Sequence, residues 1–348
     1  MSSIWNNRIS VSIFGEAHSH TIGVTVEGLP AGEYIDADAL AAFMARRTPK
    51  ACCTEEEIRR NKALPRIMSG IHNDRTTGGQ LCAFLQNPEP VPADDKNVSP
   101  FAQPGHADYT GAVRYKGFSD VKECGEFTDR FAAPLCFAGA VCAQILERRG
   151  IYVGAHIAQI HTFKDNPFDK VRISRDAIIS VRQKDFPVIH DRKGWAMLED
   201  IQRARESGES LGGIVECAAV NVPAGVGSTL FNGLETNIAQ LIFGISGVKG
   251  LEFGAGFSSA DMIGTQNSDE FYVDDHGHVV TKTNNHGGVM GGISSGMPVT
   301  LNVAFKPAAP AQEGLGCASC VVPRAVPCVE AAVDIALLSN MLDYPNFC

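Results

Sequence analysis

The chain has 348 residues, 44% of them hydrophobic and 20% charged, which is typical of a globular protein long enough to bury a core. Its formal net charge of −9 disfavours nucleic acid as a partner, and no segment approaches the roughly 18 consecutive apolar residues of a membrane span. Its 11 cysteines follow no regular spacing and its N-terminus lacks an apolar signal segment, so we expect a cytoplasmic protein with reduced thiols.

Two segments, residues 15–32 and 208–225, resemble each other. Each begins with Gly-Glu, runs through a strand and ends with Pro-Ala-Gly. Apolar residues at helical spacing follow both segments, over residues 36–47 and 234–245. The chain therefore repeats one plan of strand, turn and helix.

A second similarity relates residues 67–90 to residues 289–310, where a glycine-rich turn leads into a strand. Either pair alone could be chance similarity between short strands bounded by glycine and proline. Because both pairs occur in the same order, we expect two related halves, residues 10–110 and 205–310, within a single domain that covers residues 1–348.

Further helices are predicted by apolar spacing over residues 134–149, 194–207 and 326–342. The strands alternate apolar and polar residues, which is typical of antiparallel sheets. No exact Gly-x-Gly-x-x-Gly run follows a strand, so a dinucleotide-binding fold is not indicated. These patterns predict an α+β protein in which helices are covered by antiparallel sheets.

Residues 284–296, Asn-Asn-His-Gly-Gly-Val-Met-Gly-Gly-Ile-Ser-Ser-Gly, precede an alternating strand, Val299–Phe305, that ends at Lys306. Glycine allows close approach of the backbone to a ligand, and successive free N–H groups can hold a phosphate. The run is therefore either a phosphate-binding loop or a flexible, solvated hairpin.

His18 and His106 lie in turns and have side chains suited to proton transfer near neutral pH. No cluster of acids and histidines completes a metal site, and the single Cys-x-x-Cys at Cys317 and Cys320 has no second pair to complete a zinc site. We therefore expect no metal. The cations available for an anionic substrate are Arg46, Arg47, Arg59, Arg60, Arg130, Lys306 and Arg324.

Together these motifs resemble the chorismate synthase family from residue 14 to residue 342. The Pro-Gly-His-Ala-Asp-Tyr motif of the family is identical at residues 104–109. Other family motifs are similar to residues 14–32, 46–49, 68–78, 208–213, 248–256, 284–296, 305–307 and 322–327.

The resemblance implies a sandwich of helices between antiparallel sheets and assembly as a homotetramer. It implies anti-1,4-elimination of phosphate from 5-enolpyruvylshikimate 3-phosphate, giving chorismate at the end of the shikimate pathway to aromatic amino acids. Reduced FMN would be the cofactor of this lyase, lending an electron and taking it back, with an external flavin reductant as partner. The resemblance also associates the chain with NADP.

By motif match, His18 would help the phosphate to leave and His106 would donate a proton toward the flavin. Arg47 and Arg130 would hold the anionic substrate. The positions that match flavin contacts are Thr128, Ser246, Gly247, Gly291 and Lys306.

The chain departs from the family after Pro307, where a shortened segment replaces the loop that leads to Gly-Arg-His-Asp. The arginine, histidine and aspartate of that motif fall on Gly316, Cys317 and Ala318, and Cys53 stands where the family usually has an arginine. Three alternatives follow. The first is an active chorismate synthase. The second is a catalytically impaired paralogue, which binds flavin or a phosphorylated ligand or serves as a structural subunit, and the third is an enzyme of altered flavin chemistry.

Overall fold

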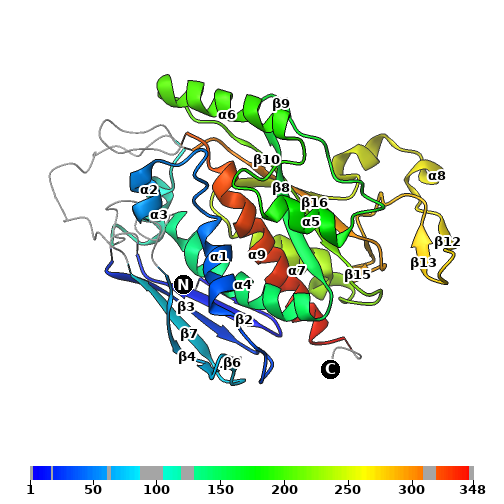
Figure 1. The fold of residues 1–348 in the computed structure, drawn as a ribbon, viewed down its shortest axis with the longest axis horizontal. Coiled ribbons are helices and arrows are strands. Elements are labelled where there is room, and N and C mark those ends of the chain that lie inside the picture. Colours follow the sequence, from blue (N-terminus) through cyan, green and yellow to red (C-terminus); the bar gives the residue numbers. More distant parts are fainter. Residues whose placement is uncertain are drawn as a thin grey trace.

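The computed structural model describes residues 3–16, 19–60, 64–86, 105–118, 129–308 and 319–344. Two five-stranded sheets lie on either side of a layer of helices (Figure 1). Helix α4 packs against the first sheet and helix α9 against the second. The predicted α+β sandwich, with helices between antiparallel sheets, is confirmed.

The first sheet has the strand order β1-β2-β3-β7-β4, and all of its neighbouring strands are antiparallel. Alternate residues of β7 are buried, as expected for a sheet with one face on the core. The strands are β1 (Ile4–Asn6), β2 (Ser10–Phe14), β3 (Thr21–Glu27), β4 (Arg66–Ser69) and β7 (Leu81–Gln86).

The second sheet has the order β11-β16-β10-β8-β9 and is also antiparallel. Helices α5 (Arg175–Arg182) and α6 (Asp191–Glu206) contact β8 and β9, respectively. Because the sheet is covered on both faces, β8 and β10 are buried along most of their length. The strands are β8 (Tyr152–Ile160), β9 (Phe163–Lys164), β10 (Gly213–Val220), β11 (Val248–Phe253) and β16 (Val299–Phe305).

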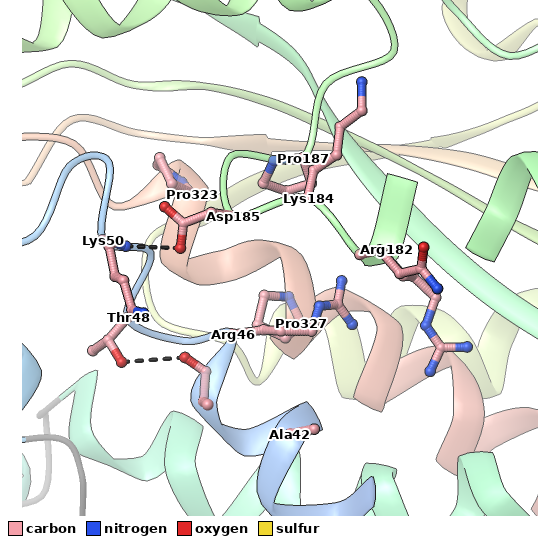
Figure 2. A pocket seen from close by; sticks show the side chains of 12 residues that line it. Ala42, Arg46, Thr48, Lys50, Arg182, Lys184, Asp185, Pro187, Pro323 and Pro327 are labelled. Atoms are coloured by element: carbon pink, nitrogen blue, oxygen red, sulfur yellow. Dashed lines mark hydrogen bonds between the residues drawn. The ribbon is translucent and has the colours of Figure 1, made fainter. Parts of the chain in front are cut away.

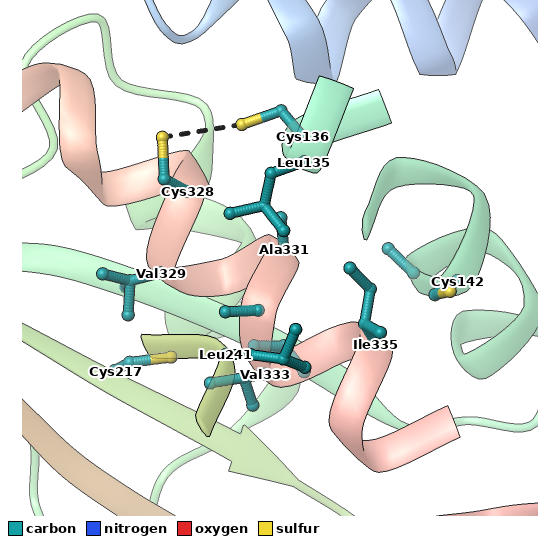
Figure 3. Packing of buried hydrophobic residues seen from close by; sticks show 14 of the residues in the cluster. Leu135, Cys136, Cys142, Cys217, Leu241, Cys328, Val329, Ala331, Val333 and Ile335 are labelled. Carbon is teal, nitrogen blue, oxygen red and sulfur yellow. Dashed lines mark hydrogen bonds between the residues drawn. The ribbon is translucent and has the colours of Figure 1, made fainter. Parts of the chain in front are cut away.

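The central layer consists of α1 (Ala37–Ala45), α4 (Ala132–Arg148), α7 (Leu234–Phe243) and α9 (Val322–Met341). The Sγ atoms of Cys136 and Cys328 lie 3.6 Å apart, and one turn further along both helices Gly139 faces Ala331 (Figure 3). A Cβ at Gly139 would overlap Ala331, so glycine allows the two helices to approach closely. Since residue numbers rise together along this contact, α4 and α9 are parallel and their N-termini lie at the same end.

Short elements connect these layers. The short helices are α2 (Glu55–Arg60), α3 (Asp108–Arg114), α8 (Gly264–Asn267) and the 3₁₀ turns η2 (Asp129–Phe131), η3 (Leu230–Asn232) and η4 (Gly256–Asp261). Three two-stranded hairpins pair β5 (Ile71–His72) with β6 (Arg75–Thr76), β12 (Phe271–Val273) with β13 (Val279–Thr281), and β14 (Val289–Met290) with β15 (Ile293–Ser294).

The repeated sequence segments fold alike. Each contains a central strand, β3 or β10, that is followed after a turn by a helix of the central layer, α1 or α7. In the described part of the chain, no helix is both long enough and apolar enough to cross a membrane.

Candidate functional site

The candidate site lies at one end of the sandwich, where segments far apart in sequence meet. The start of β10 lies beside the end of β16, since Gly213 pairs with Phe305. Just before β10, Leu211 N donates a hydrogen bond of 2.8 Å to Ser319 O, shortly before α9 begins. Lys306, which follows β16, and the N-terminus of α9 therefore lie at the same end.

Lys306 joins three of the segments that carry predicted site residues. Its Nζ donates to Gly105 O at 2.6 Å, and its backbone N donates to Gly247 O at 2.9 Å. His106 follows Gly105 directly and precedes α3, and Ser246 is exposed beside Gly247. An ammonium group has three N–H donors. The other two of Lys306 have no partner among the described residues and are available to an anion.

Arg47 is the second residue after α1 and is 8% exposed. Its Nε donates to Met44 O at 3.2 Å, and no carboxylate among the described residues pairs with its guanidinium. Helices α1 and α4 run antiparallel, since Asp36 N at the start of α1 donates to Gln144 Oε1 near the end of α4, whereas the charges of Arg46 and Arg47 after α1 act on Cys136 near the start of α4. The end of α1 therefore lies near the start of α4, which places Arg47 at the same end as Arg130 in η2.

Several positive groups lie at this end of the molecule although the whole chain is acidic. The partial positive charges of two parallel helix N-termini, those of α4 and α9, add to the charges of Arg47, Arg130 and Lys306. A helix N-terminus with nearby cations is an arrangement that binds phosphate and carboxylate groups. These cations belong to segments far apart in the sequence, and the fold brings them to the same end of the molecule.

The glycine run lies at the opposite end of β16 from Lys306. The seven residues of that strand span roughly 20 Å. Gly291 and Gly292, with φ of 63° and 83°, form the two-residue turn between β14 and β15, and backbone with φ > 0 at both positions favours glycine. Gly291 is exposed, with open space on its Cβ side. Within the described chain, Gly291 is thus separate from the group formed by Lys306, Gly247 and His106.

A buried carboxylate, Asp269, fixes the start of the glycine run. It accepts hydrogen bonds from Asn285 N at 2.8 Å and His286 N at 3.0 Å, and its Oδ2 lies 2.7 Å from His286 Nδ1. Burial alone would raise the pKa of Asp269, but these hydrogen bonds and that of Thr283 lower it. The contacts argue against a flexible, solvated loop. Sequence reasoning missed Asp269, because nothing in the sequence links it to a run that begins 15 residues later.

Two predicted site residues, His18 and Thr128, lie outside the described residues, as do Cys317 and most of the shortened segment after Pro307. The described residues on either side show where these segments begin and end. Strands β2 and β3 flank the segment that contains His18; they pair with each other, and β3 also pairs with β7. The turn η2, which contains Arg130, directly follows Thr128.

A pocket of about 230 Å³ between α1, α5 and α9 is separate from these residues (Figure 2). Three of the four cations that line it, Arg46, Arg182 and Lys184, are already paired. Arg46 forms a bidentate ion pair with Glu330, Arg182 lies 2.6 Å from Glu147, and Lys184 lies 2.6 Å from Asp191. Of the predicted site residues that the structure describes, Arg46 alone lines this pocket, and its guanidinium is held by Glu330, so we assign the pocket's charged groups to the support of the central helices.

Comparisons with known proteins agree over nearly the whole chain. A family profile described as chorismate synthase matches residues 9–315. A chorismate synthase from Thermococcus kodakarensis is 36% identical, with 96% of each chain covered. One from Lancefieldella parvula is 33% identical, with 99% of this chain and 98% of the relative covered.

A crystal structure of a chorismate synthase has a TM-score of 0.79 to this fold and 26% sequence identity, and the match covers 97% of this chain and 93% of that chain. The similarity thus extends through both sheets and the central helices. Sequence, profile and fold agree, and the chain belongs to the chorismate synthase family.

Proposed function

We propose that the chain catalyses the anti-1,4-elimination of phosphate from 5-enolpyruvylshikimate 3-phosphate, giving chorismate, as the last step of the shikimate pathway. Membership of the family supports a lyase of this kind. The single observation that carries the proposal is the group formed by Lys306, Gly105 and Gly247, which lies with His106 and Arg47 at the N-terminal end of α4 and α9.

The chemistry of this end suits the reaction. The substrate carries a phosphate and carboxylates, so binding it requires cations, and departure of the phosphate develops negative charge that fixed donors stabilise. Arg47 and Arg130 would hold the substrate. His106 would hold a proton at its imidazole near the reacting atoms, and His18 would protonate the departing phosphate.

Reduced FMN fits the residues around Lys306. Gly105 leaves open space beside the ammonium, where a Cβ would lie 3.8 Å from Nζ, and the two donors of Lys306 that have no partner among the described residues could meet an anionic or carbonyl group. We infer that Lys306, Ser246 and Gly247 would hold the flavin, with Thr128 as a further contact, whereas Gly291 lies beyond the opposite end of β16 and would not reach the same flavin within one chain. When bound, reduced FMN supplies an electron transiently and takes it back. An external reductant, with NADP as the associated nucleotide, would keep it reduced in the cytoplasm.

Exposed aromatic side chains support a homotetramer. Phe231 is 88% exposed, Phe257 81% and Phe271 53%, and the last lies on the β12–β13 hairpin beside the exposed Val273 and Val279. Contiguous exposed apolar patches such as the one on this hairpin mark surfaces of interaction with another chain. Light scattering coupled to size-exclusion chromatography measures the mass, and a monomer at micromolar concentration would contradict this part of the proposal.

The test of function is an anaerobic assay of the purified full chain with reduced FMN and 5-enolpyruvylshikimate 3-phosphate, followed by the absorbance of chorismate. We expect product to form over many turnovers. Absence of product at high enzyme concentration, from protein shown to be folded by circular dichroism, would overturn the active assignment.

The shortened segment after Pro307 favours a second candidate, a catalytically impaired paralogue. The family aspartate that acts in proton transfer falls on Ala318, which cannot carry a proton. Such a paralogue would bind FMN and the phosphorylated substrate without turnover. Calorimetric titration with both ligands separates the two candidates, because saturable binding without chorismate formation identifies the paralogue.

A further inference from the structure

Glu330 of α9 is a fully buried carboxylate that joins three elements of the fold. Both of its oxygens pair with the guanidinium of Arg46, which directly follows α1, and Nη2 of Arg46 lies 2.8 Å from Oε1. The same Oε1 accepts a hydrogen bond of 2.8 Å from Ala155 N of β8. Because donors from two other elements fix this carboxylate, the guanidinium of Arg46 is held in one orientation relative to α9 and β8.

A second carboxylate holds the chain a few residues after Arg46. Asp185 lies three residues after the end of α5, and its two oxygens accept hydrogen bonds from Lys50 N at 2.9 Å and from Ala51 N at 2.7 Å. Figure 2 shows the contact with Lys50. The segment of residues 46–51 is therefore attached at one end to α9 and at the other end to the loop that follows α5.

Arg47 lies inside this attached segment. Its side chain is 8% exposed, and its Nε donates to Met44 O at 3.2 Å. No carboxylate among the described residues pairs with its guanidinium, so the remaining N–H groups are available to an anion. A side chain that is already ordered loses less conformational entropy when it binds a ligand. The attachments on either side of Arg47 therefore preorganise it for an anionic ligand.

The stability of the fold does not require an ion pair at this position. Taking two charges out of water is costly, and apolar side chains of similar volume in place of a buried ion pair often leave a protein equally stable. Other buried positions of α9 are apolar, such as Ala331 and Ile335 (Figure 3). The ion pair between Glu330 and the residue before Arg47 is better explained by the geometry that it imposes.

We propose that Glu330 is a positioning residue for substrate binding, which acts through Arg46 to fix Arg47 in the orientation that receives a phosphate or carboxylate group. Asp185 holds the other end of the same segment. Glu330 is fully buried, so it does not itself contact the substrate. The inference rests on the proposed function, in which Arg47 holds the anionic substrate.

The main test is Glu330→Gln, which keeps the shape of the side chain and removes its charge. Calorimetric titration with 5-enolpyruvylshikimate 3-phosphate should show binding weakened by about ten- to a hundredfold, because a displaced arginine loses charge-assisted hydrogen bonds to the substrate. Titration with FMN should show unchanged affinity, since the flavin is assigned to the residues around Lys306. A general loosening of the central helices would instead weaken the binding of both ligands.

Glu147→Gln is the matched control, because it is the same substitution in the same group of buried charges. Glu147 accepts a hydrogen bond of 2.6 Å from Arg182 Nη1, and in the described chain it forms no hydrogen bond or ion pair with residues 46–51. Its replacement should leave the affinity for the substrate within about twofold. Equal losses of affinity in Glu147→Gln and Glu330→Gln would overturn the proposal.

Combination with Arg47→Met shows whether Glu330 acts through Arg47. The single variant Arg47→Met should weaken substrate binding at least as much as Glu330→Gln does. Adding Glu330→Gln to Arg47→Met should then have little further effect, because the side chain that Glu330 positions is already absent. Additive losses in the double variant would overturn the proposal, since Glu330 would then affect the substrate independently of Arg47.

If Glu330→Gln proves unfolded by circular dichroism, Asp185→Ala decides the question, because Asp185 is exposed and its loss frees the other end of the segment. It should weaken substrate binding by about fivefold, and only while Arg47 is present. Unchanged affinity would reject the positioning of Arg47 by these contacts.

The same measurements separate this inference from the proposed function. Saturable substrate binding without chorismate formation would reject turnover, and the combined variants would still decide the role of Glu330. Normal turnover with additive losses would reject the positioning role alone. An unaltered chain that does not bind the substrate would reject both.

Discussion

His156 and Glu216 face each other across the β8–β10 pairing, with Nε2 of the histidine 2.7 Å from Oε2 of the glutamate. The His156 side chain is fully buried. Its other ring nitrogen, Nδ1, lies 3.4 Å from Asp165 Oδ2. One histidine is thus held between two carboxylates under the helices that cover the second sheet.

This arrangement predicts that stability decreases as the solution becomes alkaline. Burial alone would lower the pKa of His156, but the two carboxylates raise it above the ordinary value of 6.5. Because the folded-state pKa is higher than the unfolded one, the stabilisation is complete below pH 6.5 and is lost as pH rises through the folded-state value. Urea unfolding between pH 6 and pH 9 measures this decrease in the free energy of unfolding.

The matched variants are His156→Gln and His161→Gln. Removing the buried imidazole leaves two carboxylates without their partner and should cost about 3–5 kcal/mol of unfolding free energy. His161 is 56% exposed and pairs with Asp200, so its replacement should have little effect. A pH dependence that stays unchanged in His156→Gln would assign the effect to other groups.

The central helices and β16 could be predicted because their patterns are local. Apolar spacing predicted α1, α4, α7 and α9, and the alternating residues Val299–Phe305 form β16. Helix α9 begins at Val322, four residues before the predicted start, because Pro323 fits the first turn of a helix where its missing N–H is not needed. The sequence therefore already contained, in Pro323, the signal for an earlier start of this helix.

The site could be predicted only as a set of separate residues. Nothing local indicates that Lys306 contacts Gly105, which is 201 residues away, or that Arg324 of α9 lies 3.4 Å from Glu57 of α2. These contacts follow from the packing of the central helices and from the order of the strands in the second sheet. The motif resemblance supplied the expected roles of the residues, whereas the fold shows that Lys306 lies beside Gly247 and that Gly291 lies beyond the opposite end of β16.

Lys306→Met should weaken the binding of FMN and phosphate by roughly ten- to a hundredfold, the effect of one lost charge-assisted hydrogen bond. It also removes the bond to Gly105 that holds the segment before His106. Lys282→Met is the control, since Lys282 pairs with Glu270 on the exposed β12–β13 hairpin. Calorimetric titration with FMN measures the difference, and equal affinities in the two variants would reject the assignment of Lys306.

His106→Ala should abolish chorismate formation while leaving the fold intact, because a proton held at this imidazole takes part in the reaction. His276→Ala replaces an exposed histidine in the turn of the β12–β13 hairpin and should retain full activity. Anaerobic turnover of both variants is compared at equal FMN saturation, so that a binding defect is not mistaken for a catalytic one. Full activity of His106→Ala would reject its role.

Two buried acids of α9, Glu330 and Asp334, should respond in opposite ways to amide substitution. Glu330 is fully buried, pairs with Arg46 through both carboxylate oxygens and accepts a hydrogen bond of 2.8 Å from Ala155 N. Glu330→Gln leaves Arg46 without its charged partner and should cost about 3–5 kcal/mol. Burial instead raises the pKa of Asp334 well above its ordinary value and so favours its neutral form in the folded chain.

Because folding raises the pKa of Asp334, its contribution to stability decreases as pH rises above the unfolded value near 3.8. Asp334→Asn keeps the shape and removes this penalty, so it should be neutral at low pH and increasingly favourable toward pH 8. Thermal unfolding of both variants from pH 5 to pH 8 measures the contrast. Loss of stability in Asp334→Asn as large as in Glu330→Gln would show that Asp334 is charged and paired in the folded protein.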